Sequence, residues 1–95
     1  MRKYRLGRKA RADMREIAVY IAKHNSSAAL NWLASLDERF SLLATQPQMG
    51  EKCDDLRPAL RRITAGNYVI YFQPEAGTVR IIRVLHGARD SGGLV

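Results

Sequence analysis

The spacing of the apolar residues changes at Gly50, and this change constrains the fold more than any other feature of the chain. Before Gly50 the apolar residues recur every three or four positions, as in a helix with one face on a core. After it they gather in short runs bounded by Gly, Pro and Asn, which is typical of strands joined by turns. Helices followed by strands predict an α+β fold. The helical positions are Ala10, Met14, Ile17, Ile21 and Ala22, and then Ala29, Leu33, Leu36, Phe40 and Leu43.

The boundaries of these elements predict an antiparallel helical hairpin packed on a small antiparallel sheet. The first helix follows Gly7 and ends near residue 25, Ser26 or Ser27 caps the second, and Pro47 closes it. Strands are expected at 60–64, 68–73 and 78–85, with a short N-terminal strand at 3–6 and a loop at 51–57. Short turns make the three strands antiparallel neighbours. The 95 residues are expected to form a single domain over 1–95.

Both faces of the later strands are apolar. In residues 68–72 and 79–85 nearly every side chain is hydrophobic, whereas the helical hairpin can cover only one face of a sheet. The second face also needs to be covered. Little of the remaining chain is left for this, so the pattern predicts a partner protein on the second face.

The chain is strongly basic, with 16 Lys and Arg against nine Asp and Glu and a net charge of +7. The first eleven residues hold six cations and no acid. A small basic protein usually binds a polyanion, either nucleic acid or an acidic protein, although a basic surface can also serve solubility alone. No apolar stretch approaches the ~20 residues of a membrane-spanning helix, and no apolar run follows the basic N-terminus as in a signal peptide. We therefore expect a cytoplasmic protein.

One cysteine excludes an intramolecular disulfide and a multi-cysteine zinc site, so no metal or cofactor is expected. Cys53 lies in an acidic loop, which raises a thiol pKa, and we do not expect it to be a nucleophile. Trp32 could stack on a nucleic-acid base, but such a residue more often packs in a core or interface.

His86 follows the last predicted strand and is the main candidate for a residue that acts as an acid or base. With Arg61, Arg62 and Arg83 it could form a site that handles phosphate, the imidazole acting as acid or base while the arginines stabilise developing charge. The simpler alternative is that His86 caps the end of the strand through a backbone hydrogen bond.

An ordered set of motifs runs through residues 3–90. It comprises residues 4–6, 12–22, 42–50, 55–57 and 66–72, and it closes with Ile81-Ile82-Arg83-Val84-Leu85-His86-Gly87-Ala88-Arg89-Asp90. In this order the motifs resemble the toxins of bacterial type II toxin–antitoxin systems, in the ParE branch of the RelE/ParE superfamily. The resemblance implies the same α+β fold, a helical hairpin on a sheet. It also implies a cognate antitoxin with an acidic C-terminal segment that wraps the toxin, and hence a hetero-oligomer that contacts DNA only through the antitoxin.

The resemblance leaves two activities open. ParE-type toxins inhibit DNA gyrase and block replication, whereas RelE-type toxins cut mRNA on the ribosome, and fold alone does not separate them. RelE-like enzymes usually carry Tyr, His or Lys near the extreme C-terminus, and residues 90–95 contain none of these. This departure favours the gyrase inhibitor. In the ribonuclease alternative the catalytic residues are Arg61, Arg62, Arg83 and His86.

A third reading is a small basic module that binds nucleic acid through an arginine-rich sheet face. The strand faces are too apolar for it, and no alternation of aromatic and basic residues is present. The residues that we expect to contact a target or the antitoxin are Arg61, Tyr68, Tyr71, Arg83, His86 and Arg89.

Overall fold

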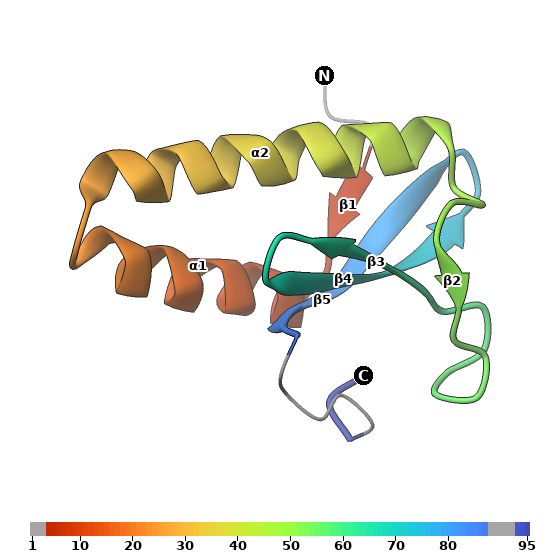
Figure 1. Ribbon diagram of the computed structural model, residues 1–95. Helices are drawn as coiled ribbons and strands as arrows, with labels where there is room; N and C mark the ends of the chain where they lie inside the picture. The colour runs from red at the N-terminus through yellow and green to blue at the C-terminus, as the bar shows by residue number, and fades with distance from the viewer. Residues whose placement is uncertain (1–3, 88–92) are drawn as a thin grey trace.

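Two helices lie on one face of a five-stranded sheet (Figure 1). The computed structural model describes residues 4–87 and 93–95. The predicted α+β fold is confirmed, including the short N-terminal strand. The elements in chain order are β1 (Tyr4–Leu6), α1 (Arg8–Ala22), α2 (Ser26–Thr45), β2 (Glu51–Lys52), β3 (Arg61–Ala65), β4 (Tyr68–Glu75) and β5 (Thr78–His86).

The sheet is mixed, with strand order β1-β5-β4-β3-β2. Strands β2 to β5 pair antiparallel, as the short turns predict, whereas β1 pairs parallel with β5, Tyr4 lying opposite Val79. A parallel pair needs a long crossover, and the helical hairpin is part of the chain that connects β1 to β5. The sequence analysis expects a loop at residues 51–57, but Glu51 and Lys52 form a two-residue strand against Arg62 and Arg61. Two charged residues carry no periodicity that predicts a strand.

The start of each helix depends on the residue before it. Asn25, rather than Ser26 or Ser27, caps α2, because its side-chain oxygen accepts a 3.0 Å hydrogen bond from the backbone N–H of Ala28. Gly7 precedes α1 and donates its N–H to the carbonyl of Ile81 at 2.8 Å. A Cβ at position 7 would lie 2.9 Å from that carbonyl oxygen, so glycine permits the close approach of the chain to β5.

The main core lies between the helices and the sheet. From α2 it receives Leu36, Phe40 and Leu43, all fully buried as the helical spacing predicts. Tyr4 of β1 packs edge-on against Phe40, with ring centroids 5.2 Å apart, and its hydroxyl donates to Asp37 at 2.5 Å. The strands contribute Ala65, Ile70, Phe72, Val79, Ile81 and Val84.

A register shift in the sheet sets which residues of β5 face this core. Ile81 and Val84 both belong to it although they are three positions apart, and strict alternation would place them on opposite faces. Phe72 pairs with Ile81 while Tyr71 pairs with Arg83, so β5 carries one extra residue at this point. The irregularity therefore lets both side chains reach the helices.

The second face of the sheet is covered by the chain itself, contrary to the sequence-based expectation. A second apolar cluster consists of Cys53, Leu60, Tyr71, Ile82 and Leu85, with Leu56, Val69, Leu94 and Val95 packed against it. The cover comes from the polar-looking segment between β2 and β3 and from the last two residues of the chain. Isolated Leu, Cys and Val residues in these segments gave no periodic signal, so the inference that only a partner can cover this face was wrong.

Candidate functional site

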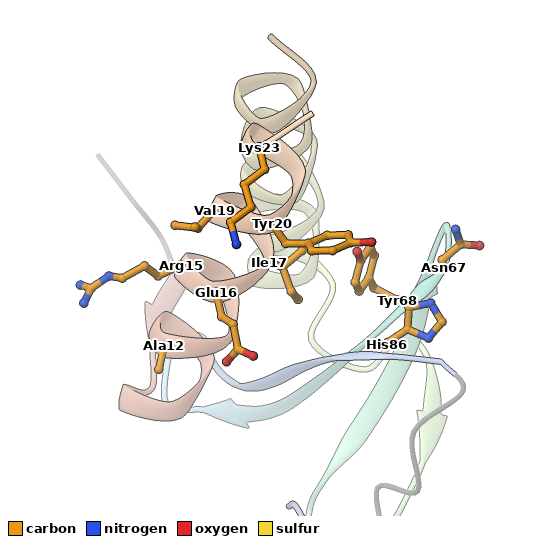
Figure 2. A pocket seen from close by; sticks show the side chains of 10 residues that line it. All are labelled: Ala12, Arg15, Glu16, Ile17, Val19, Tyr20, Lys23, Asn67, Tyr68 and His86. Atoms are coloured by element: carbon orange, nitrogen blue, oxygen red, sulfur yellow. The ribbon is translucent and has the colours of Figure 1, made fainter. Parts of the chain in front are cut away.

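An open groove lies between α1 and the end of the sheet at which the β3–β4 turn meets the last residue of β5 (Figure 2). Its volume is about 920 Å³. The helix contributes one wall, and residues 67, 68 and 86 contribute the other, although they are more than forty positions away along the chain. The lining residues are Ala12, Arg15, Glu16, Ile17, Val19, Tyr20, Lys23, Asn67, Tyr68 and His86.

The helical wall is apolar in its centre and charged at its rim. Val19 is 54% exposed and Tyr20 64% exposed, and these are two of the four large apolar side chains that the described part of the chain leaves exposed. Arg15 and Lys23 bring positive charge to the same wall. Exposed apolar side chains within a polar rim mark sites of protein association. The groove therefore has the residue types that are typical of a site of protein association.

A row of aromatic rings forms the opposite wall. Tyr68 of β4 lies between Trp32 of α2 and His86 of β5, with ring centroids 5.3 Å and 5.6 Å away. Trp32 is half-buried and packs against the main core, which confirms that it is a packing residue. His86 pairs with Tyr68 across the two strands and is exposed. The row places one edge of the imidazole where a bound molecule can reach it.

Arg83 is held by two segments of the protein other than its own strand. Its guanidinium donates two hydrogen bonds of 2.7 Å to the Asp13 carboxylate and a third of 2.7 Å to the backbone carbonyl of Leu94. Asp13 also accepts a 3.0 Å hydrogen bond from the N–H of Val84, which satisfies the edge of β5 beyond the end of β1. The hydrogen bonds that Arg83 donates to Asp13 raise the pKa of Arg83 above its ordinary value. This arginine joins α1, β5 and the end of the chain.

Arg61 and Arg62 are also engaged within the protein. Arg61 donates to the backbone carbonyls of Met49 at 2.9 Å, of Gln48, and of Gly50, and so holds the segment that follows α2. Arg62 pairs with Glu51 at 2.5 Å. Hydrogen bonds with Tyr71 first, and then with Glu51, raise the pKa of Arg62.

The site residues that the sequence predicts therefore do not form one site in the structure. Tyr68 and His86 come together in the groove, whereas Arg61, Arg62 and Arg83 each have partners of their own and Tyr71 is buried in the second cluster. Arg89 lies outside the described residues. Their roles in binding a target or antitoxin stay predictions. Sequence reasoning missed Val19 and Tyr20, and the available signal was that these two neighbours fall outside the apolar stripe of their helix.

Cys53 is buried, and burial first of all raises the pKa of its thiol; the charge of Arg62 opposes this, and Glu51, Asp55 and Asp54 add smaller increases. The direction agrees with the sequence-based expectation, but burial rather than the acidic loop is the main cause. Within residues 4–87 and 93–95 no group of three or more His, Cys, Asp or Glu side chains could hold a metal ion. In the same part of the chain no helix is long and apolar enough to cross a membrane.

Comparison with known proteins agrees with the fold and the motifs. The family model of the ParE toxin of the type II toxin–antitoxin system parDE matches residues 4–91. Toxin ParE1 of Caulobacter vibrioides is 33% identical over 92 residues, which cover 96% of this chain and 95% of that protein. Toxin ParE1 of Mycobacterium tuberculosis is 32% identical over 63 residues, 65% of this chain and 64% of that protein.

A solved structure described as the chromosomal ParDE TA system from P. aeruginosa has the same fold. It superposes with a TM-score of 0.71 over 87% of this chain and 92% of that chain, at 20% identity. At this identity the match shows the fold alone. The family is shown by the family model and the Caulobacter relative, which both span nearly the whole sequence. The chain belongs to the ParE toxin family of type II toxin–antitoxin systems.

Proposed function

We propose that this toxin arrests growth in the cytoplasm by inhibiting DNA gyrase and that a cognate antitoxin neutralises it. The observation that carries the choice of gyrase over mRNA is the pairing of the sheet arginines. Cleavage of a phosphodiester needs cations free to stabilise the developing charge beside a proton donor. Arg61, Arg62 and Arg83 instead hold carbonyls and carboxylates of the protein itself.

The same pairing weighs against the ribonuclease alternative. Each of the three arginines would have to release its intramolecular partner before binding phosphate, and for Arg83 the released partner is a carboxylate whose side chain is only 11% exposed. Leaving such a charge unpaired is costly. The sheet is equally unsuited to a nucleic-acid module that binds through these arginines.

The groove supports the antitoxin part of the proposal. Val19, Tyr20 and Tyr68 offer apolar and aromatic surface for side chains of a partner segment, and tyrosine is enriched at the centres of interfaces. Lys23 at the rim would attract the acidic C-terminal segment expected of the antitoxin. We infer a hetero-oligomer in which a single toxin domain presents this groove to the antitoxin.

The test assays the purified toxin for gyrase supercoiling and for ribosome-dependent mRNA cleavage side by side. We expect inhibition of supercoiling, no mRNA cleavage, and relief of the inhibition by the antitoxin. Cleavage of mRNA without an effect on gyrase would refute the proposed target.

A paired set of variants tests the groove. The double variant V19S/Y20S is expected to weaken antitoxin binding at least tenfold. The matched control L30S/L42S alters the other two exposed large apolar side chains, which are not among the residues lining the groove, and should bind normally. Equal binding by both variants would place the antitoxin elsewhere.

A further inference from the structure

The cations of α1 differ from those of the sheet. Arg8, Lys9, Arg11 and Arg15 are all exposed, and none of their side chains has a hydrogen-bond or ion-pair partner within residues 4–87 and 93–95. In the same part of the chain Arg61, Arg62, Arg80 and Arg83 are all engaged by oxygen atoms of the protein. Lys23, Arg39, Lys52 and Arg57 are also exposed without such partners but are spread over the chain, so the largest group of available cations in the described residues lies on the first half of α1.

Three of these cations form a line on one face of the helix. Residues three and four positions apart are neighbours on a helix surface, so Arg8, Arg11 and Arg15 make a continuous row, here named the basic stripe. A rise of 1.5 Å per residue spreads the row over about 10 Å, which corresponds to about three phosphate steps along one strand of DNA. Lys9 lies beside the stripe on the same two turns.

Among the described residues no acid forms an ion pair with the stripe, although Glu16 follows Arg15 on the helix. The first turn of α1 contains no acidic residue, and the positive end of the helix dipole lies at the same place. Asp13, on the next turn, is engaged by Arg83 on another side of the helix. Cations near a helix N-terminus repel the dipole, so a bound anion relieves an unfavourable arrangement.

The chemistry of the stripe favours phosphate over an acidic protein segment. Protein interfaces have an apolar centre, whereas the only residue that lies between the three arginines on this face of the first two turns is the small Ala12. The larger apolar surface begins one turn further along α1, at Val19 and Tyr20, in the groove that Arg15 also lines. Contacts to a nucleic-acid backbone need only charge and hydrogen-bond donors, and the forked guanidinium suits phosphate oxygens.

We propose that the basic stripe of α1, formed by Arg8, Arg11 and Arg15, binds the phosphate backbone of duplex DNA without reading its sequence. This differs from the expectation that DNA is contacted only through the antitoxin. The stripe gives the toxin a direct electrostatic contact with DNA, and it is independent of which enzyme the toxin inhibits.

The test measures binding of the purified chain to two 20-base-pair duplexes of unrelated sequence by fluorescence anisotropy between 50 and 200 mM salt. With three arginine–phosphate contacts, the logarithm of the association constant should fall against the logarithm of the salt concentration with a slope of about −2.7. The affinity should therefore fall about 40-fold between the two salt concentrations. Both duplexes should bind equally. In the variant R8Q/R11Q/R15Q most of this salt dependence should be lost, together with at least tenfold in affinity at 50 mM salt.

The matched control is R39Q/K52Q/R57Q, which removes the same charge from three exposed cations on α2, on β2 and in the loop before β3. It should keep the parent's salt slope. Circular dichroism verifies that both variants fold. Equal losses in the two variants would mean that net charge alone drives binding and would overturn the proposal.

A 20-residue polyglutamate peptide distinguishes an acidic protein ligand from DNA. If polyglutamate binds more tightly than the duplexes and depends on the same three arginines, the stripe is a site for an acidic protein and the DNA proposal fails. Weaker binding of the peptide than of DNA at equal salt supports it. Absence of DNA binding by the parent at 50 mM salt also overturns it.

Discussion

Arg83 and Asp13 are seventy positions apart in sequence and are joined by two parallel hydrogen bonds of 2.7 Å. Their side chains are 12% and 11% exposed, so the pair is largely removed from water. The forked geometry is the strongest form of an arginine–carboxylate contact. It fixes α1 against β5 at the point where β1 no longer covers the strand, and the third hydrogen bond of Arg83 holds the end of the chain.

Breaking this pair should destabilise the fold strongly. In Arg83→Gln the Asp13 carboxylate remains buried without its cation, and we expect the free energy of unfolding to fall by about 3–5 kcal/mol. The matched control is Arg62→Gln, whose pair with Glu51 is 42% and 64% exposed and should contribute less than about 1 kcal/mol. Urea denaturation compares the two. If the urea midpoints of the two variants were equally lowered, the Arg83–Asp13 pair would contribute no more to stability than an exposed pair.

The last two residues should protect the second apolar cluster. Removing Leu94 and Val95 uncovers side chains around Leu60, Tyr71 and Leu85, and exposed apolar patches bind hydrophobic dyes and promote association. We expect stronger dye fluorescence and concentration-dependent association in the truncated chain. The full chain should show neither from this face, since it covers the cluster itself. Equal dye binding by the two proteins would mean that the tail does not cover the sheet in solution.

Burial should make the Cys53 thiol slow to react. Its folded-state pKa is raised from 9.0, mainly because burial disfavours the thiolate. Iodoacetamide at pH 8 should therefore modify the native chain far more slowly than the urea-unfolded chain. A raised pKa contributes stability that is fully present below the unfolded value and is lost as pH rises through the folded value. The contribution of this residue should thus decline above about pH 9, the unfolded value, and the decline should be absent in Cys53→Ala.

The helices were more predictable than the covering segments, for physical reasons. The spacing of Leu36, Phe40 and Leu43 identified buried positions directly, because each helical turn repeats the same contact with the sheet. Leu33 has the same spacing and is only half-buried, since the α1–α2 connection lies away from the strands (Figure 1). Cys53 and Leu60 gave no signal, because a loop that folds over a sheet has no period.

The candidate site was only partly predictable for a related reason. Sequence identifies arginines but not their partners, and the contacts of Arg83 with Asp13 and of Arg61 with Met49 depend on packing between distant segments. Tyr68 and His86 were both predicted to be contact residues, and they lie side by side because β4 begins at Tyr68 where β5 ends at His86. Their role in binding stays a prediction. The groove itself needed the three-dimensional position of α1.

Phe40 is expected to be the most sensitive core position on α2. It is fully buried against Tyr4 and the sheet, so Phe40→Ala removes burial and leaves a cavity, at a cost of about 3–5 kcal/mol. Domains of this size have a total stability of roughly 5–14 kcal/mol, so this loss removes a large share of it. Leu30→Ala on the exposed face should change the melting temperature by no more than a degree or two. A similar small shift for Phe40→Ala would contradict its position in the core.

His86 should not be needed for toxicity if the target is gyrase. Its ring lies edge-on to Tyr68 in the groove, and Arg61, Arg62 and Arg83 are all engaged elsewhere, so no cation from this set is free to act with it on a phosphodiester. His86→Gln keeps hydrogen-bonding capacity but removes proton transfer near neutral pH. We expect this variant to fold, to bind the antitoxin, and to arrest growth with DNA damage at the parent's level, as measured by colony counts and a DNA-damage reporter. Tyr68→Ala removes the ring that contacts both Trp32 and His86 and should weaken antitoxin binding more than His86→Gln does, because it disrupts the aromatic wall. Loss of toxicity in His86→Gln, together with loss of a ribosome-dependent mRNA cleavage that the parent displays, would replace gyrase with mRNA as the target.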